Sequence, residues 1–302
     1  MQSLYYYIKH PKVLGNVVLV HYCGWMPDRL YLKLKFKMIA GKRLNLKAPQ
    51  SFNEKLQWLK LYNRRPEYTM MVDKVRVKDY VASVIGEQYI IPTIAVWKDP
   101  DEIDFDKLPE RFVLKVNHNS GTGMYICRDK SKMDVEKVKA ELRKGLKENY
   151  FKKNREWPYK NVERRILAEQ FMADDNHKDL TDYKFFCFHG IPKYCQVIQN
   201  RRTKETIDFF DMDWIHQPFI GLNEEVSNAE QIPIRPSRFD EMKRVASLLS
   251  EGIPFSRIDL YEINSKVYFG EITFFPASAQ GIFRPSKWDY TFGSWIKLPE
   301  KN

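Results

Sequence analysis

The sequence predicts an α+β fold with largely antiparallel sheets. Apolar, strand-like runs follow one another with only a few helical patterns between them, and strands and helices do not alternate regularly. This order favours hairpins over the crossover connections of a parallel sheet. The 302 residues, 43% of them hydrophobic and 14% aromatic, suffice for one large domain or for two to three small ones.

The first part of the chain is expected to be helical. Residues 28–63 have a largely helical pattern, and Ser51-Phe52-Asn53-Glu54 matches the S-x-x-E capping box that opens a helix over Lys55–Tyr62. Asp73–Ile85 has apolar residues at helical spacing and ends at a glycine. The apolar run Val13–Cys23 is too short to span a bilayer and has no signal cleavage site, which favours a buried helix or strand.

The remaining elements are mostly strands. In chain order we expect a strand over Tyr89–Trp97, an acidic loop over Asp99–Asp106, strands over Phe112–Asn117 and Met124–Cys127, a helix over Met133–Tyr150, a strand over Arg165–Phe171, a hairpin of Asp182–Phe188 with Pro192–Gln199, a helix over Phe239–Leu249 and a hairpin over Phe255–Thr273. Pro92 places the first strand at a sheet edge, because proline cannot donate to a strand ladder.

The chain is strongly basic, with a formal net charge of +11 and a pI of about 9.3. This balance favours anionic partners such as nucleotides, acidic glycans or anionic lipids, and no basic helix with base-reading spacing indicates nucleic acid. Basic and apolar residues interleave over 29–47, which fits either an anionic membrane surface or a solvated helix face. Four cysteines without a CxxC pair indicate a reducing, cytoplasmic compartment.

Two acidic residues interrupt apolar strands in the last third of the chain. Asp259 and Glu271 lie on the two strands of the last hairpin, where they can stand side by side on one face. Two carboxylates in an apolar setting are costly without a cation between them, and Mg²⁺ commonly takes one or two carboxylates with nucleotide phosphates. The alternative is an edge hairpin with two solvated acids. Arg257, on the same strand face as Asp259, would bind a carboxylate or phosphoryl oxygen, or form a structural ion pair with Asp259.

Two lysines interrupt strands in the middle of the chain. Lys115 precedes Ser120-Gly121-Thr122-Gly123, whose glycines let backbone amides approach a polyphosphate closely. Lys115 needs an anion if it is buried, or else it lies on a half-exposed strand face. Lys184 alternates with bulky apolar residues and would bind a second phosphate, or else protect an exposed edge strand.

Three further sequence features are weaker candidates for binding residues. The strand Ile166-Leu167-Ala168-Glu169-Gln170-Phe171 ends in polar residues that could meet an adenine edge, or it is an ordinary core strand. Arg201 and Arg202 follow a strand end, where a guanidinium could bind an oxyanion. Asp211-Met212-Asp213 is a D-x-D pattern, which holds a metal and a sugar nucleotide in glycosyltransferases but also arises by chance in acidic loops.

Taken in order, these motifs resemble an ATP-grasp enzyme. The resemblance rests on a strand lysine (Lys115), a small-residue loop, a hinge strand with Glu169, a lysine before a hairpin (Lys184), an acid on one strand (Asp259), and Glu271, Thr273 and Pro276 in place of E-x-N-x-x-P. The wording of Asp73-Lys74, Leu114–Asn117, Asp182–Phe185, Arg257–Tyr261 and Gly270–Thr273 is similar to the teichuronopeptide-biosynthesis (TupA-like) branch. That branch is associated with bacterial cell-surface polysaccharides, and the resemblance covers roughly residues 28–295.

The resemblance implies two antiparallel α+β subdomains that clasp ATP. It divides the chain into a basic helical N-terminal region (1–70), a helix and strand before the ATP-grasp unit (71–110), an N-terminal lid subdomain (111–180) and a C-terminal subdomain with the Mg²⁺ site (181–302). The loop carries no lysine of its own, so its contacts with phosphate would come mostly from backbone amides.

The resemblance also assigns residues to roles. It implies ATP contacts from Lys115, Ser120, Gly121, Thr122, Gly123, Glu169, Gln170, Phe171, Lys184 and Asp174 or Asp175. It implies Mg²⁺ ligands at Asp259, Glu271 and Thr273, although threonine stands where the family usually has asparagine. It implies catalytic roles for Arg257, Lys184 and Arg202.

The implied reaction is ATP-dependent ligation, in which a carboxylate becomes an acyl phosphate that an amine attacks. The expected partners are ATP, Mg²⁺, an acidic sugar or polysaccharide precursor (free or lipid-linked) and an amine donor, with the protein in the cytoplasm or in peripheral contact with the inner membrane face. The alternatives are a glycosyltransferase that uses Asp211 and Asp213, a kinase of a sugar or lipid carrier on the same fold, and a non-enzymatic binder. No heptad or symmetric patch indicates an oligomeric state.

Overall fold

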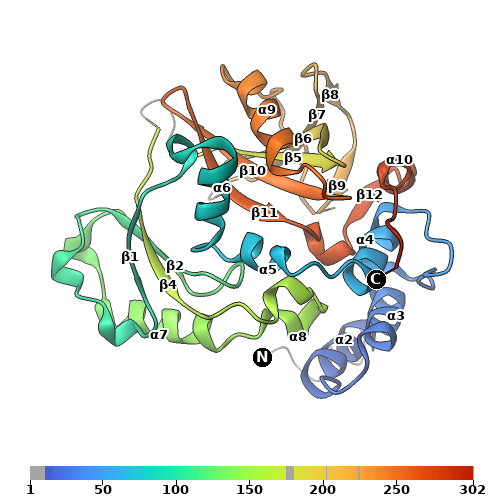
Figure 1. Ribbon diagram of the computed structural model, residues 1–302, viewed down its shortest axis with the longest axis horizontal. Coiled ribbons are helices and arrows are strands. Elements are labelled where there is room, and N and C mark those ends of the chain that lie inside the picture. The colour runs from blue at the N-terminus through green and yellow to red at the C-terminus, as the bar shows by residue number, and fades with distance from the viewer. Residues whose placement is uncertain (1–10, 175–179, 202, 224, 302) are drawn as a thin grey trace.

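The structure is a computed structural model and describes residues 11–174, 180–201, 203–223 and 225–301. Its strands form a four-stranded sheet of order β1-β4-β2-β3, a six-stranded sheet of order β11-β10-β5-β6-β7-β8, and a β12-β9 pair (Figure 1). Every one of these strand pairs is antiparallel. The predicted α+β class with antiparallel sheets is therefore confirmed.

Helices dominate the part of the chain before the first strand. They are α2 (Pro11–Tyr22), α3 (Asp28–Ala40), α4 (Phe52–Tyr62), α5 (Glu67–Val72) and α6 (Val77–Ile85). The capping box is present as predicted, because the Ser51 hydroxyl accepts from the Glu54 N–H and the Glu54 carboxylate accepts from the Ser51 N–H. Helix α2 is half-exposed rather than buried: Leu19 is covered, whereas its other large apolar residues are open on one side.

The expected helix over Asp73–Ile85 begins four residues late. Asp73 ends α5 in an extended conformation, and its carboxylate accepts from the side-chain amide of Asn117 at 2.8 Å. This long-range contact fixes the chain between the two helices, so the second helix begins only at Val77. Local periodicity predicted the helix, and a tertiary contact moved its start.

The four-stranded sheet has one face in a core and the other face open. Its strands are β1 (Thr93–Trp97), β2 (Phe112–Val116), β3 (Met124–Cys127) and β4 (Ile166–Gln170), with β1 at an edge as Pro92 predicted. Helix α7 (Val135–Lys147) packs against β2 and β3 and buries Phe112, Leu114 and Val116. Because side chains alternate along a strand, Lys115 points to the opposite face. A separate short helix, α8 (Tyr150–Asn154), follows α7.

The six-stranded sheet comprises β5 (Asp182–Phe188), β6 (Ile191–Gln199), β7 (Thr206–Asp211), β8 (His216–Gln217), β10 (Ser256–Ile263) and β11 (Lys266–Thr273). The side chains of β5 alternate between the two faces of the sheet, and a different helix covers each face. Phe185 packs on Phe239 of α9 (Phe239–Leu249), with ring centroids 5.6 Å apart. Phe186 faces the other way, 5.7 Å from Phe292 of α10 (Lys287–Trp295). Lys184 shares the face of Phe186 but lies two residues beyond that aromatic core.

Several elements were not predicted, and three of them are only two or three residues long. They are β7, β8, β9 (Ile220–Leu222), β12 (Ile282–Arg284) and α10. Strands of two or three residues are too short for a period to be read from sequence. Two of these elements depend on pairing with another strand. β7 extends the sheet beside β6, and β12 pairs with β9, which is distant from it in the sequence.

Candidate functional site

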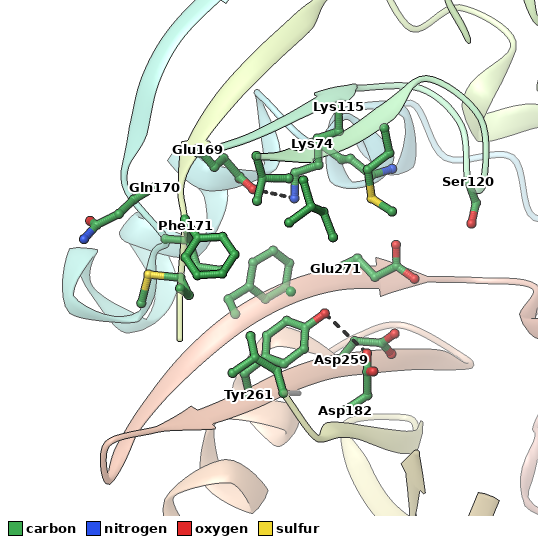
Figure 2. Close-up of a pocket in the computed structure, with 18 of the residues that line it drawn as sticks. Lys74, Lys115, Ser120, Glu169, Gln170, Phe171, Asp182, Asp259, Tyr261 and Glu271 are labelled. Atoms are coloured by element: carbon green, nitrogen blue, oxygen red, sulfur yellow. Dashed lines mark hydrogen bonds and ion pairs between the residues drawn. The ribbon is translucent and has the colours of Figure 1, made fainter. Parts of the chain in front are cut away.

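A cavity of about 480 Å³, lined by both charged and apolar residues, lies between the open face of the four-stranded sheet and the six-stranded sheet. Figure 2 shows Lys74, Lys115 and Glu169 on one side of it and Asp182, Asp259 and Glu271 on the other. The predicted site residues that line it are Lys115, Ser120, Gly121, Thr122, Glu169, Gln170, Phe171, Asp174, Lys184, Asp259 and Glu271. Three other predicted residues do not line the cavity: Gly123, Arg257 and Thr273. Two more lie outside the described residues, namely Asp175 and Arg202.

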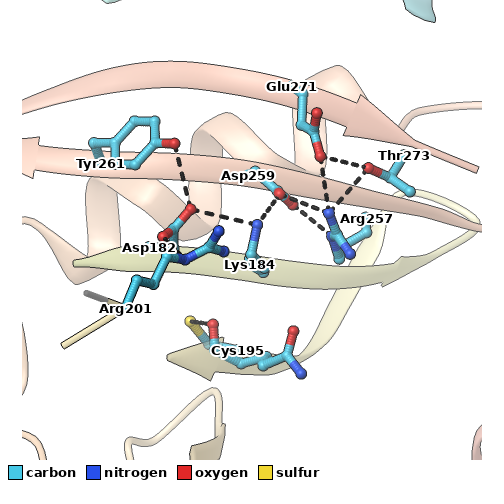
Figure 3. A network of polar contacts seen from close by, with 10 residues as sticks. Asp182, Lys184, Cys195, Arg201, Arg257, Asp259, Tyr261, Glu271 and Thr273 are labelled. Atoms are coloured by element: carbon cyan, nitrogen blue, oxygen red, sulfur yellow. Dashed lines mark hydrogen bonds and ion pairs between the residues drawn. The ribbon is translucent and has the colours of Figure 1, made fainter. Parts of the chain in front are cut away.

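The two acids of the last hairpin stand opposite each other, as predicted. Asp259 on β10 pairs directly with Glu271 on β11. Arg257 lies between them: its Nε and Nη2 donate to the two oxygens of Asp259 at 2.6 and 2.7 Å, and Nη2 also donates to Glu271 Oε1 at 3.0 Å (Figure 3). The ion pair of Arg257 with Asp259 is therefore present. The alternative of two solvated acids is wrong, because Asp259 is buried.

Lys184 adds a second cation to this group. It lies on β5, an interior strand, and its Nζ contacts the carboxylate of Asp259. The edge-strand alternative for Lys184 is therefore wrong. Burial raises the pKa of Asp259, against the opposing effects of Arg257 and Lys184. Burial also acts to raise the pKa of Glu271, but Arg257 and Lys184 outweigh it and hold the pKa of Glu271 at about 2.

The opposite wall of the cavity carries a second ionic group. Lys115 on β2 pairs with the carboxylate of Glu169 on β4, and Lys78 of α6 lies 2.7 Å from the other oxygen of Glu169. Although burial acts to raise it, the two lysines lower the pKa of Glu169. The half-exposed alternative for Lys115 is only partly right: its side chain is 23% exposed, but it is paired and faces the cavity.

Lys74 and Lys78 were missed as site residues. Lys74 Nζ donates to the Asn119 carbonyl at 2.7 Å, at the start of the small-residue loop, and the side chain lines the cavity. Burial lowers the pKa of Lys74, and the charge of Glu271 across the cavity opposes that effect. The sequence carries no local signal for this role of Lys74 beyond the resemblance, because a lysine in a predicted helix is usually solvated.

The small-residue loop divides its residues between two tasks. Ser120, Gly121 and Thr122 line the cavity. Gly123 instead faces α7: its N–H donates to Glu141 at 3.0 Å, and a Cβ placed on it would lie 2.8 Å from the Cα of Gly145. The structure therefore gives Gly123 a packing role, in which a close backbone approach at φ +70° requires glycine.

The strand end after β4 lies at the mouth of the cavity. Two guanidinium groups lie near the Phe171 ring, with the Cζ atoms of Arg111 and Arg128 at 5.2 and 5.1 Å from the ring centroid. Asp174 accepts a hydrogen bond at 3.0 Å from the Asn264 N–H in the β10–β11 turn. These contacts fix the end of β4 next to the cavity, where the resemblance implies an adenine hinge.

The remaining arginine, Arg201, also reaches the cavity. Its Nε lies 2.8 Å from Asp182, which in turn accepts from the Tyr261 hydroxyl at 3.3 Å (Figure 3). Asp182 and Tyr261 were not predicted as site residues, because an acid at a strand start and a tyrosine in a strand are both common without function.

The D-x-D acids lie in a turn rather than in the cavity. One carboxylate oxygen of Asp211 accepts from the N–H groups of Asp213 and Ile215 at 3.0 and 2.8 Å, which closes the loop between β7 and β8. Neither acid lines the cavity. An aspartate that accepts from backbone N–H groups two and four residues further on is a common structural feature of turns.

The acidic pair offers oxygen ligands for a divalent cation. Within the described residues, no cluster of three or more His, Cys, Asp and Glu side chains could hold a metal by itself. The hydrogen bonds to Glu271 from Arg257 and Thr273 both go to Oε1, so within the described ranges Oε2 has no protein donor. The Glu271 side chain is 38% exposed. Two carboxylates with one open oxygen fit Mg²⁺, which keeps waters and phosphate oxygens as its other ligands.

Two antiparallel sheets that face each other over one cavity, with lysines on one wall and paired carboxylates on the other, define an ATP-grasp fold. A family model described as TupA-like ATPgrasp matches residues 54–297. Because the match covers most of the sequence, this chain belongs to the TupA-like ATP-grasp family, as its motifs predicted.

Solved structures with a similar fold include D-alanine–D-alanine ligase from Helicobacter pylori (12% identity, TM-score 0.46, 83% of this chain and 70% of that one). The corresponding ligase from Bacillus anthracis, complexed with ATP, has 13% identity, a TM-score of 0.44, and coverage of 75% and 63%. The ATP-grasp ligase PsnB, complexed with a minimal precursor, Mg and ADP, has 11% identity, a TM-score of 0.40, and coverage of 81% and 66%. The chain thus spans less than two thirds of the length of the last two. No curated protein matches the sequence.

Proposed function

We propose that this protein uses ATP and Mg²⁺ to activate a carboxylate as an acyl phosphate, which an amine then attacks, in the biosynthesis of capsular or other cell-surface polysaccharide. One observation carries the proposal: Asp259 and Glu271 lie opposite each other in register and share one cavity with Lys74, Lys115 and Lys184. Membership of the TupA-like family supports the polysaccharide role.

The chemistry has two steps. A carboxylate oxygen attacks the γ-phosphorus of ATP, the bond to the β-phosphate oxygen breaks, and ADP leaves. The amine nitrogen then attacks the acyl carbon, the bond to the phosphate oxygen breaks, and inorganic phosphate leaves as the nitrogen loses a proton. Such transfers need positioning and charge neutralisation more than covalent help from the protein.

The described residues provide that neutralisation. Lys74 and Lys115 would hold phosphate oxygens from the four-stranded sheet, with the amides of the small-residue loop beside them. Bound Mg²⁺ would sit at Glu271 and Asp259 and neutralise phosphate charge. Arg257, which bridges both carboxylates from behind the cavity wall, would hold Asp259 and Glu271 in position for the cation rather than contact the transferred phosphoryl group itself.

The acceptor in this proposal is an acidic sugar or polysaccharide precursor, free or lipid-linked, because a basic protein attracts anionic glycans. A lipid-linked precursor would place the reaction at the inner face of the cytoplasmic membrane. The amine donor is an amino acid or an amino sugar.

The test begins with ligand binding and then measures turnover. ATP with Mg²⁺ should raise the melting temperature, with about 2.7 kcal/mol of stabilisation at a hundred times the dissociation constant, whereas UDP-sugars should not. Release of ADP should then require both a uronic acid and an amine from a panel of amino acids and amino sugars. Turnover with a sugar hydroxyl and no amine would indicate a kinase instead.

Matched acid variants separate the site from the D-x-D turn. Glu271→Gln should lower kcat at least about a hundredfold, in line with the loss of one charge-stabilising group. Asp213→Asn, an exposed acid outside the cavity, should leave kcat nearly unchanged. Stabilisation by UDP-sugars only, with Asp213 essential and Glu271 dispensable, would establish the glycosyltransferase alternative and reject the ligase.

A further inference from the structure

We propose that the hairpin of helices α2 and α3 is a docking surface for an anionic phospholipid bilayer. The inference goes beyond the ligase proposal and does not depend on it, since the hairpin lies at one end of the molecule, beside α4 and α8 and away from the cavity (Figure 1). Within the described residues, no helix is long and apolar enough to cross a bilayer.

The exposed apolar residues of the hairpin carry the first part of the argument. The surface consists of Leu14, Val18, Tyr22, Trp25, Leu30 and Leu34, which are all large and exposed. Tyr22 and Trp25, at the tip between the helices, are 75% and 80% exposed. Tyrosine and tryptophan favour the interface of a bilayer, where the ring is apolar and its polar edge stays wet.

The tip is held in place rather than loose. Arg155, which is buried, donates through Nη2 to the carbonyls of Cys23, Gly24 and Met26 at 3.3, 3.0 and 3.4 Å. The backbone of the tip is thus bonded to the body of the protein, while its aromatic side chains point into solvent. A rigid tip that presents two aromatic rings binds a surface without a large loss of conformational entropy.

Charge identifies the surface that would be bound. The first fifty residues contain nine Lys and Arg and one acidic residue, Asp28, so this sixth of the chain holds most of the net charge of +11. Asp28 is already paired, with Arg64 at 2.6 Å. On α3, Arg29, Lys33 and Lys37 are exposed at four-residue spacing, next to the exposed row of Leu30 and Leu34. A basic row beside an apolar row fits anionic headgroups over acyl chains.

The same charges disfavour a second copy of this chain as the partner. A symmetric dimer through this hairpin would place each basic row near its own copy, with no acidic residue on the hairpin free to compensate. An anionic bilayer has the opposite sign and no fixed shape to match.

The experiment is co-sedimentation of the full chain with vesicles. Vesicles of phosphatidylglycerol and phosphatidylcholine should bind the protein, and vesicles of phosphatidylcholine alone should bind it much less. Binding should weaken with added salt. Each basic residue near an anionic surface contributes about fivefold, so the triple variant R29E/K33E/K37E should lower the partition coefficient at least about a hundredfold. Y22S/W25S should also weaken binding, and this loss should persist at high salt.

A charge-matched control distinguishes the surface from net charge. Lys107, Lys132 and Lys137 are exposed on the four-stranded-sheet side, and K107E/K132E/K137E makes the same change in net charge. This control should retain most of the binding. Equal losses in both triple variants would overturn the proposal, as would a concentration-dependent dimer that Y22S/W25S dissociates. ATP–Mg²⁺ stabilisation should be unchanged in every variant, so failure here leaves the ligase proposal standing.

Discussion

Lys60 offers a quantitative test of how the helical region supports the site. It lies on α4 with no exposed surface, and its Nζ donates to the carbonyls of Asn154 at 3.1 Å and Ser278 at 3.0 Å. Ser278 belongs to the turn that follows β11, in which Ala277, Ser278 and Ala279 all have positive φ, from 47° to 58°. Left-handed backbone at three consecutive non-glycine residues is costly and needs such external support.

Burial lowers the pKa of Lys60 from 10.5 to about 8, although the charge of Glu156 opposes it. Below pH 8, Lys60 is protonated in both the folded and the unfolded protein. The free energy of unfolding is then lowered by the full cost of burying the charge. Between pH 8 and 10.5 the unfolded state binds more proton than the folded state, so this lysine makes stability rise with pH. From pH 7 to pH 10 the rise attributable to Lys60 is about 2.5 kcal/mol.

The measurement is urea unfolding of the wild type and Lys60→Met at several pH values from 7 to 10. The free energy of unfolding of the wild type, minus that of the variant, should increase by about 2.5 kcal/mol over this range. Taking the difference cancels groups that titrate equally in both proteins. Lys35→Met should behave in the same direction, because burial also lowers the pKa of Lys35 to about 8. Parallel stability curves for wild type and Lys60→Met would refute the reasoning.

Two further predictions concern the site itself. Lys184→Met should cost about 3 kcal/mol of stability, because it leaves the buried carboxylate of Asp259 with one cation fewer; in the double variant with Asp259→Asn the two costs should be less than additive, and strict additivity would contradict a direct pair. Gly123→Ala should destabilise by about 1–3 kcal/mol in urea, because its Cβ would meet Gly145, whereas Gly121→Ala has open space and should cost only its positive-φ strain. Equal costs at the two glycines would show that packing on α7 does not matter.

The sequence alone determined most of the longer elements and the family. Ser51 and Glu54 cap α4 and Pro92 keeps β1 at an edge, because capping and ladder bonding depend on neighbours along the chain. Asp259 and Glu271 were placed correctly on adjacent strands, but the register set by the turn alone would pair Asp259 with Gly270. A register shift between Asp259 and Leu260 brings Glu271 opposite Asp259 instead. The ordered motifs were enough to identify the ATP-grasp family.

Only the tertiary structure decided which charges meet. Lys74 and Lys78 contact groups from other elements, and Arg257 lies between two carboxylates. Asp211, in contrast, lies away from the cavity. These placements depend on how the two sheets face each other. Ion pairing acts over a few ångströms between residues far apart in sequence, so no local pattern records it.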